Sequence, residues 1–277
     1  MATMSPLLLL LIGCGEPEPP APVGPEGRLV IEELYYAGSP PMGGTDHYFS
    51  DQFIELANNS PDRIEVGGLY VADVYGAAGV INPGMAPDAY TDRLILDSVW
   101  RIPGDPEDTI LEPGESILIA HDGTNHTPFS TVDLSGADWE AYVDGGNDDD
   151  HPTVDNLEEV HFSGGYDWLI TVFGPSVVVL ESGADFSDFS GGPWPLQEGE
   201  LDDVIDGIDT VMDGNSGDFK RLADSVDSGF MYVSDTYSGE SLQRHRTGVE
   251  AIEGGWLQDT DDSSEDFEVL QTPEPRG

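Results

Sequence analysis

Short apolar runs rich in β-branched and aromatic residues recur from residue 28 onward, and turn-forming segments separate them. Glu-Pro-Gly-Glu (112–115) and Phe-Gly-Pro-Ser (173–176) place proline where a β-turn uses its fixed backbone angle. The long amphipathic periodicity of helices is missing. The pattern therefore predicts an all-β sandwich with little helix. The predicted strands are 29–36, 52–57, 69–74, 93–99, 116–120, 168–173, 177–181, 204–211 and 229–233.

Four long segments separate these strands, at 37–51, 75–92, 121–166 and 182–203. Loops beyond roughly 15 residues without structure are uncommon in compact domains, and those that occur are often functional. We therefore expect long loop insertions that either carry function or contain further elements.

The N-terminal residues have the pattern of an export signal. An apolar run at 7–12 is followed directly by Gly13 and Cys14, and six apolar residues are too few for a bilayer that needs about 20. The stretch 11–14, Leu-Ile-Gly-Cys, resembles the lipobox of bacterial lipoproteins. The resemblance implies cleavage before Cys14 and acylation of that cysteine. In lipoproteins of this kind, an Asp directly after the cysteine commonly causes retention in the inner membrane. This chain has Gly15 at that position, so the resemblance favours the outer membrane or cell surface.

A proline-rich stretch follows the cysteine. Residues 15–27 contain five prolines, and such a segment extends by about 3.1 Å per residue, so roughly 40 Å in all. The sequence thus predicts a signal peptide at 1–14, a tether at 15–27 and a single β-sandwich domain with insertions at 28–277.

The charge limits the choice of partners. Fifty-five acidic residues face nine basic ones, for a formal net charge of -46. Such a chain repels nucleic acid and anionic surfaces, so we expect no nucleic-acid partner and membrane contact through the N-terminal lipid. Cys14 is the only cysteine, which excludes a disulfide within the chain.

Several segments resemble the lamin-tail domain. Residues 53–73 resemble its opening motif, an Ile-Glu-Leu strand followed by an Asn-rich turn and an apolar strand. Residues 241–244 (SLQR), together with the later pairs 266–267 and 272–273, resemble the closing motif of that domain. Residues 111–120 resemble the Pro-Gly turn and the strand that lie between the two motifs. The resemblance implies an immunoglobulin-like sandwich.

The chain also resembles a family of bacterial surface lipoprotein domains of unknown function, over about residues 29–272. This resemblance implies a surface lipoprotein without an established activity. It depends on the segments YYAGSP (35–40), YFSDQFIEL (48–56), VWRIPGD (99–105), DLSGADWE (133–140) and FGPSVVVL (173–180).

Common catalytic motifs are absent from the sequence, which contains no G-x-S-x-G, H-E-x-x-H, C-x-x-C or G-K-[ST]. Cys14 is assigned to lipidation. A pair of glycosidase carboxylates is defined by its separation in space, so the sequence alone does not locate one. We therefore expect a protein that is not an enzyme.

Two loop segments carry residues that metals bind. His121, Asp122 and His126 follow a predicted strand and are read either as a zinc site or as polar loop residues, because their spacing is not diagnostic. The segment 144–156 is either a calcium site or a solvated acidic loop, since hard oxygen ligands cluster there without EF-hand spacing. Its candidate ligands are Asp144, Asp148, Asp149, Asp150 and Asp155.

Three further residues are singled out. Trp194 lies in a Gly/Pro-rich segment, where an aromatic ring either stacks on a ligand or covers the edge of its own core. Glu55 lies in the middle of a strand, where a buried charge needs a partner. Since Arg244 lies in the closing motif, we expect Glu55 and Arg244 to form a structural ion pair.

These observations favour a lipid-anchored, non-enzymatic surface β-sandwich that binds or scaffolds another surface protein or a polysaccharide. A calcium-stabilised adhesion or matrix module is the alternative, and a surface hydrolase or its accessory is a third. Apart from calcium, no cofactor is expected.

Overall fold

The computed structural model describes residues 27–42, 47–76, 90–144, 148–165, 167–168, 170–192, 194–248 and 256–276. The predicted signal with Cys14, and all of the tether except residue 27, lie outside these residues. Strands dominate the described part, which confirms the predicted all-β sandwich. No described helix is long and apolar enough to cross a membrane. The helical turns are η1 (Pro106–Asp108), η2 (Leu201–Asp203), η3 (Gly217–Phe219) and α1 (Ser263–Asp266).

The first sheet joins strands from both ends of the described chain. β1 pairs antiparallel with β2 on one side and with β15 on the other, while β7, β8 and β9 pair in parallel at the far edge. In order across the sheet, its strands are β16 (Phe267–Leu270), β15 (Ser241–Arg244), β1 (Leu29–Tyr35), β2 (Phe53–Asn58), β7 (Ser116–Ala120), β8 (Trp139–Glu140) and β9 (Asp155–Asn156).

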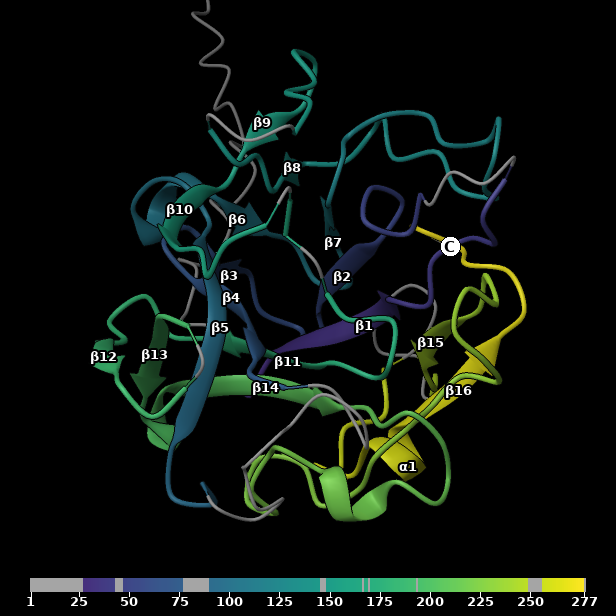
Figure 1. Ribbon diagram of the computed structural model, residues 1–277. Helices are drawn as coiled ribbons and strands as arrows, with labels where there is room; N and C mark the ends of the chain where they lie inside the picture. Colours follow the sequence, from purple (N-terminus) through teal and green to yellow (C-terminus); the bar gives the residue numbers. More distant parts are fainter. Residues whose placement is uncertain are drawn as a thin grey trace, which may run out of the picture.

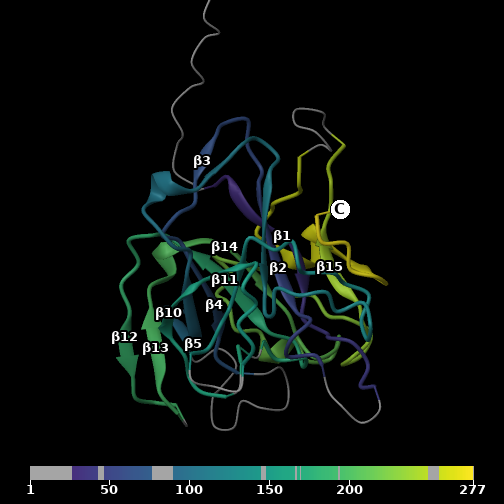
Figure 2. The same cartoon turned by 90° about the horizontal axis from the view of Figure 1, so that it is seen from above.

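The second sheet is antiparallel, and Figure 1 shows its β12 and β13 at the edge of the molecule opposite β15, β16 and α1. In order, its strands are β12 (Ser187–Phe189), β13 (Leu196–Gly199), β5 (Leu94–Arg101), β4 (Tyr70–Val74), β11 (Ser176–Leu180) and β14 (Val204–Asp209), with β10 (Glu158–His161) also paired to β5. A small third sheet consists of β3 (Ile64–Glu65) and β6 (Ile110–Leu111). The view from above in Figure 2 likewise places β12 and β13 opposite β15.

The main core lies between the two large sheets. Alternate residues of β1 and β2, such as Leu34 and Ile54, pack in one buried cluster with Val177 and Val179 of β11 and with Trp100 of β5. Because successive side chains of a strand point to opposite faces, the strands contribute every second residue to this cluster, and in β1 the alternation shifts by one residue at the irregularity between Ile31 and Glu33.

Long loops cover the outer faces of the sheets, so several strands are buried on both sides. Val132 and Leu134 pack on Tyr35 and Phe53 at the outer face of the first sheet. On the second sheet, Leu222 packs in the same buried cluster as strand residues of β4, β5 and β11. The loops therefore form part of the packed structure.

Seven of the nine predicted strands are present within two residues of their expected bounds. The prediction is wrong for 168–173, whose described residues form no strand. Trp168 and Ile170 are apolar because they are buried in the main core as part of a loop. The prediction is also wrong for 229–233, which contributes only the isolated bridge between Met231 and Thr210. The long predicted loops contain β8, β9, β10, β12 and β13, which the sequence pattern did not reveal.

The predicted ion pair between Glu55 and Arg244 is also wrong, and strand alternation explains why. Glu55 shares a face of β2 with Phe53, outside the sandwich, where Ser116 and the backbone N–H of Arg276 donate to it. Arg244 shares a face of β15 with Leu242, between the sheets. The two side chains are therefore on opposite faces of one sheet.

Candidate metal centre

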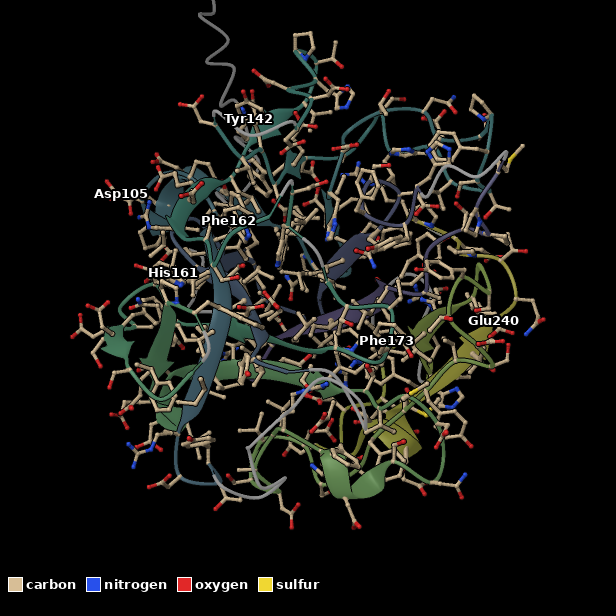
Figure 3. All side chains as sticks on the ribbon, in the orientation of Figure 1. Asp105, Tyr142, His161, Phe162, Phe173 and Glu240 are labelled. Carbon is tan, nitrogen blue, oxygen red and sulfur yellow. The ribbon has the colours of Figure 1, made fainter. Side chains whose placement is uncertain are left out.

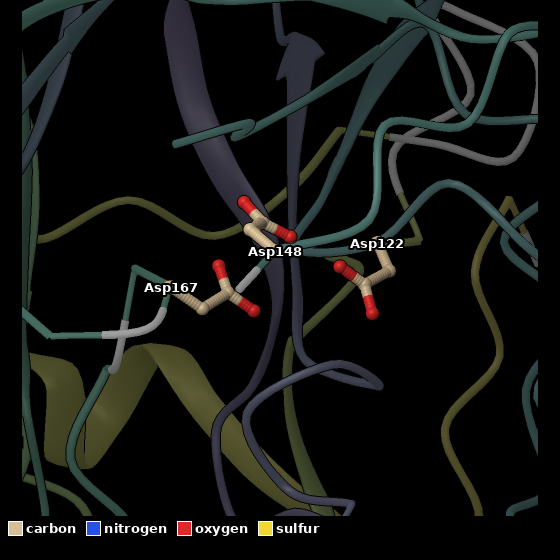
Figure 4. A group of neighbouring side chains, drawn as sticks. All are labelled: Asp122, Asp148 and Asp167. Atoms are coloured by element: carbon tan, nitrogen blue, oxygen red, sulfur yellow. The ribbon is translucent and has the colours of Figure 1, made fainter. Parts of the chain in front are cut away.

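Three aspartate side chains meet beside the end of β7, although they come from separate loops. Asp122 follows β7, Asp148 lies in the loop after β8, and Asp167 lies in the loop after β10. One carboxylate oxygen from each lies within 4.8 Å of those of the other two, and Figure 4 shows the three groups close together. We call Asp122, Asp148 and Asp167 the carboxylate cluster.

Glu140 on β8 holds two of these loops in place. Its buried carboxylate accepts hydrogen bonds from the backbone N–H groups of Gly123, at 2.6 Å, and His151, at 2.8 Å. Gly123 lies so close to Val154 that an added Cβ would lie 2.6 Å from the valine side chain. The loop after β7 and the acidic loop thus approach each other through Glu140 and a required glycine.

Backbone donors fix two members of the cluster. Asp148 accepts the N–H of Val143 at 2.7 Å, and Asp167 accepts the N–H of Trp168 at 2.5 Å. Asp167 is only 3% exposed. A buried carboxylate is costly in its charged form unless a cation or enough hydrogen-bond donors compensate it.

The cluster holds like charges without a counter-charge. Burial, followed by repulsion from Asp148, raises the pKa of Asp122 to about 8 and that of Asp167 to about 9. Burial also raises the pKa of Asp148. Among the described residues, no Lys, Arg or His side chain forms an ion pair with any of the three. The group therefore requires protons or a cation.

The spacing of the cluster suits calcium. Calcium binds oxygen at about 2.3–2.6 Å, so two oxygens on one ion lie at most about 5 Å apart, and it tolerates irregular geometry. Magnesium requires a tighter octahedron at about 2.0–2.1 Å. Zinc is bound mainly by nitrogen and sulfur, and no histidine belongs to the described cluster.

The predicted zinc set does not come together. The ring of His121 is buried and stacks on Trp168 at 5.2 Å, and burial lowers its pKa to about 3. The Nε2 atom of His126 lies 3.0 Å from the backbone oxygen of Asp122, and burial lowers the pKa of this ring as well. Of the three predicted ligands, only Asp122 faces the cluster, because the hydrophobic surroundings hold both rings elsewhere.

The acidic segment 144–156 contributes one member of the cluster, Asp148. Its other predicted ligands are exposed and outside the cluster. The charge of Asp149 raises the pKa values of Asp122 and Asp148, while its backbone hydrogen bond lowers that of Asp148. Asp150 accepts a hydrogen bond from Asn156. The remaining two are Asp144 and Asp155.

Sequence reasoning missed Asp167. It lies 45 residues beyond Asp122 and directly before an apolar run that was predicted to be a strand. The one available signal was the position of this carboxylate, next to residues expected to be buried. A buried carboxylate needs a partner, so a cation could have been inferred there. Trp194 lies apart from the cluster, on the second sheet, with its indole nitrogen bonded to Asp97.

The fold and the site together define an acidic all-β sandwich in which a carboxylate cluster joins three loops. The chain belongs to the family described as "Protein of unknown function (DUF4876)", whose model matches residues 112–203 and 200–274. All three members of the carboxylate cluster lie within the first matched segment.

A solved structure supports the same fold. The crystal structure of a DUF4876 family protein from Bacteroides thetaiotaomicron VPI-5482 is similar to this chain, with a TM-score of 0.77 and 25% sequence identity. The similarity covers 88% of this chain and 71% of that one. No curated protein matches the chain.

Proposed function

We propose that this protein is a lipid-anchored, non-enzymatic surface module that binds or scaffolds a partner, and that a calcium ion fixes its loops. The observation that carries the calcium proposal is the convergence of Asp122, Asp148 and the buried Asp167 without a counter-charge. Calcium would neutralise the cluster and tie together loops that follow three different strands. Extracellular calcium modules bind with a Kd of about 10⁻⁴–10⁻³ M, which suits an exported protein.

A thermal denaturation experiment tests the calcium proposal. At a Kd of about 10⁻⁴ M, 10 mM calcium stabilises the folded state by about 2.7 kcal/mol, so Tm should rise by about 5–10 °C. Sodium chloride of equal ionic strength should raise it much less. Asp167→Asn should remove the calcium-specific part while leaving the calcium-free protein at least as stable, because it removes the cost of ionising a buried carboxyl group.

The matched control is Asp185→Asn, since Asp185 is exposed and outside the cluster. This variant should respond to calcium like the wild-type protein. Equal shifts with calcium and sodium in the wild-type protein, or an undiminished calcium shift in Asp167→Asn, would show that the cluster is not a calcium site.

The anchor is proposed at Cys14. The lipobox resemblance and the proline-rich stretch support it, and β1 begins at Leu29, directly after the tether. Full-length protein expressed in a bacterium should partition into the detergent phase, and Cys14→Ala should not. If both forms remain in the aqueous phase, the anchor proposal fails.

We also infer an immunoglobulin-like arrangement related to the lamin tail. Segments that resemble lamin-tail motifs form β2, β7, β15 and the start of β16 in the first sheet, and the apolar strand that ends the opening motif forms β4 in the second sheet. Within the first sheet, the opening and closing segments thus lie on either side of β1. If this inference is correct, deleting β16 should unfold the sandwich, as measured by loss of the cooperative thermal transition.

A further inference from the structure

Trp194 lies at a break in the pairing along one edge of β5. On that edge, β13 pairs with Leu94–Leu96 and β10 pairs with Val99–Arg101, while β4 pairs along the other edge. Asp97 lies between the two paired stretches, and its carboxylate accepts the indole N–H of Trp194 at 2.7 Å. The Trp194 side chain therefore lies beside the interval between two strand ends.

The surroundings of Trp194 hold its ring in a defined orientation. The ring meets Tyr75 edge to face, with centroids 5.4 Å apart and an interplanar angle of 79°. Gly192 precedes it in a tight turn, where an added Cβ would lie 2.3 Å from Leu196. Next to Trp194 in sequence, the backbone oxygen of Pro195 lies 3.2 Å from the Nε2 atom of His161 on β10, which Figure 3 labels.

This fixed ring is nevertheless 40% exposed. Tyr75 and Leu196, which support it, belong to a buried cluster together with Ile95. The indole ring of Trp194 is thus held in place by its neighbours and partly open to solvent. A rigid aromatic ring already held in place loses little conformational entropy when a ligand binds.

The chemistry around the ring suits a carbohydrate. An aromatic face packs against the C–H face of a pyranose, while carboxylate and imidazole groups exchange hydrogen bonds with its hydroxyls. Asp97 and His161 bring a carboxylate and an imidazole to the surroundings of Trp194, and the buried Tyr75 supports the indole ring. The indole N–H is already used by Asp97, so the ring offers its face.

Charge and surface composition narrow the class of ligand. A net charge of -46 disfavours sulfated or uronic-acid polymers through repulsion. A protein partner would require a contiguous apolar centre. Among the exposed large hydrophobic residues, Met212 and Tyr232 both follow the bridge between Thr210 and Met231, whereas the indole of Trp194 is bonded to the carboxylate of Asp97.

We propose that Trp194, with Asp97 and His161, forms a binding site for a neutral polysaccharide. The inference rests on the proposed role as a binding module and names its ligand, at a site separate from the carboxylate cluster. The bound sugar would stack on Trp194, and its hydroxyls would bond to the neighbouring polar groups.

Native gels that contain soluble polysaccharides test this site. The neutral probes are amylopectin, mixed-linkage β-glucan, xyloglucan and galactomannan, and the anionic probe is polygalacturonate. At least one neutral polymer should retard the wild-type protein. Trp194→Ala should weaken that retardation by about tenfold or more. Tyr232→Ala is the matched control, because Tyr232 is also an exposed aromatic residue, at 41%, and it should leave the retardation unchanged.

Several results would overturn the proposal: no retardation by any neutral polymer, retardation by polygalacturonate alone, or equal retardation of wild-type protein and Trp194→Ala. Retention of the calcium-dependent rise in Tm by Trp194→Ala would show that the variant is folded and would separate this site from the calcium proposal. If Trp194→Ala lost the cooperative thermal transition, Trp194→Phe would replace it. That variant keeps an aromatic face but loses the Asp97 bond, and it should bind more weakly than wild type and more tightly than a non-aromatic variant such as Trp194→Leu.

Discussion

Replacing Arg244 with methionine should destabilise the protein by about 3–5 kcal/mol, because it would leave buried carboxylates without their cation. Arg244 is 2% exposed and lies between the sheets. Its guanidinium pairs with Asp206 at 2.7 Å, Asp259 at 3.0 Å and Asp266 at 3.4 Å. It also donates to the backbone oxygen of Ile31.

These contacts join β15 to β1, to β14 of the opposite sheet and to α1. The guanidinium also lies over the ring of Phe267, 4.6 Å from its centroid. Asp206 accepts the N–H of Ile31 at 2.6 Å as well as pairing with Arg244. Loss of one side chain would therefore disturb the closure of the sandwich at several points.

Urea denaturation provides the measurement, and Arg93→Met is the matched control. Arg93 is partly exposed, and its ion pairs with Asp92 and Glu198 lie at the surface, where such pairs contribute about 0–1 kcal/mol. A double-mutant cycle of Arg244→Met with Asp206→Asn should show strong coupling. A loss below about 1 kcal/mol for Arg244→Met would contradict this role.

The free energy of unfolding should fall as pH rises from about 5 to 9, whereas many proteins are most stable between about pH 5 and 8. Burial raises the pKa values of several carboxyl groups in the folded state. A group whose pKa is higher folded than unfolded binds more protons when folded, so its contribution to stability is complete below the unfolded pKa. That contribution is lost as pH rises through the folded pKa, and it amounts to about 1.4 kcal/mol for each pH unit that separates the two pKa values. The groups and their folded pKa values are Glu32 and Glu33 (about 7), Asp73 and Asp122 (about 8), Asp167 (about 9) and Asp206 (about 6).

Urea midpoints at pH 5.5, 7 and 8.5, in a chelating buffer of constant ionic strength, test this slope. Glu33→Gln should flatten it and stabilise the protein at pH 8.5, because Glu33 is fully buried and has one oxygen without a partner. Glu107→Gln, at an exposed position, should leave the slope unchanged. A midpoint that stays constant or climbs with pH would contradict the assignment of these raised pKa values.

The sequence pattern located strands well where hydrophobic residues formed compact runs. β1, β2 and β11 are buried along their whole length, and their β-branched and aromatic residues made them evident. The two-residue strands β8 and β9 gave no pattern, because two residues are too few to show alternation. The apolar run that begins at Trp168 predicted a strand, but Trp168 and Ile170 of this run are buried in a loop. An apolar run therefore predicts burial more reliably than it predicts a strand.

The candidate site was less predictable than the fold. Asp122 lies in a segment that its two histidines marked as a zinc candidate, and Asp148 lies in the acidic segment, where its neighbours Asp149 and Asp150 were equal candidates. Asp167 joins them only through the packing of distant loops, which local sequence does not encode. The wrong ion pair between Glu55 and Arg244 could have been avoided from the sequence. If Leu242 and Ile54 both face the core, alternation places Arg244 on the core side of its strand and Glu55 on the opposite side.

Isothermal titration calorimetry with calcium, in two buffers of different ionisation enthalpy at pH 7, tests the calcium site most directly. The burial-raised pKa values of Asp122 and Asp167 mean that protons occupy the cluster at pH 7, and bound calcium must displace them. The wild-type protein should bind one calcium ion at the cluster and release about one to two protons. Asp167→Asn should bind at least tenfold more weakly. No calcium binding by the wild-type protein, or equal affinity and proton release in Asp167→Asn, would contradict the assignment of Asp122, Asp148 and Asp167 as a calcium site.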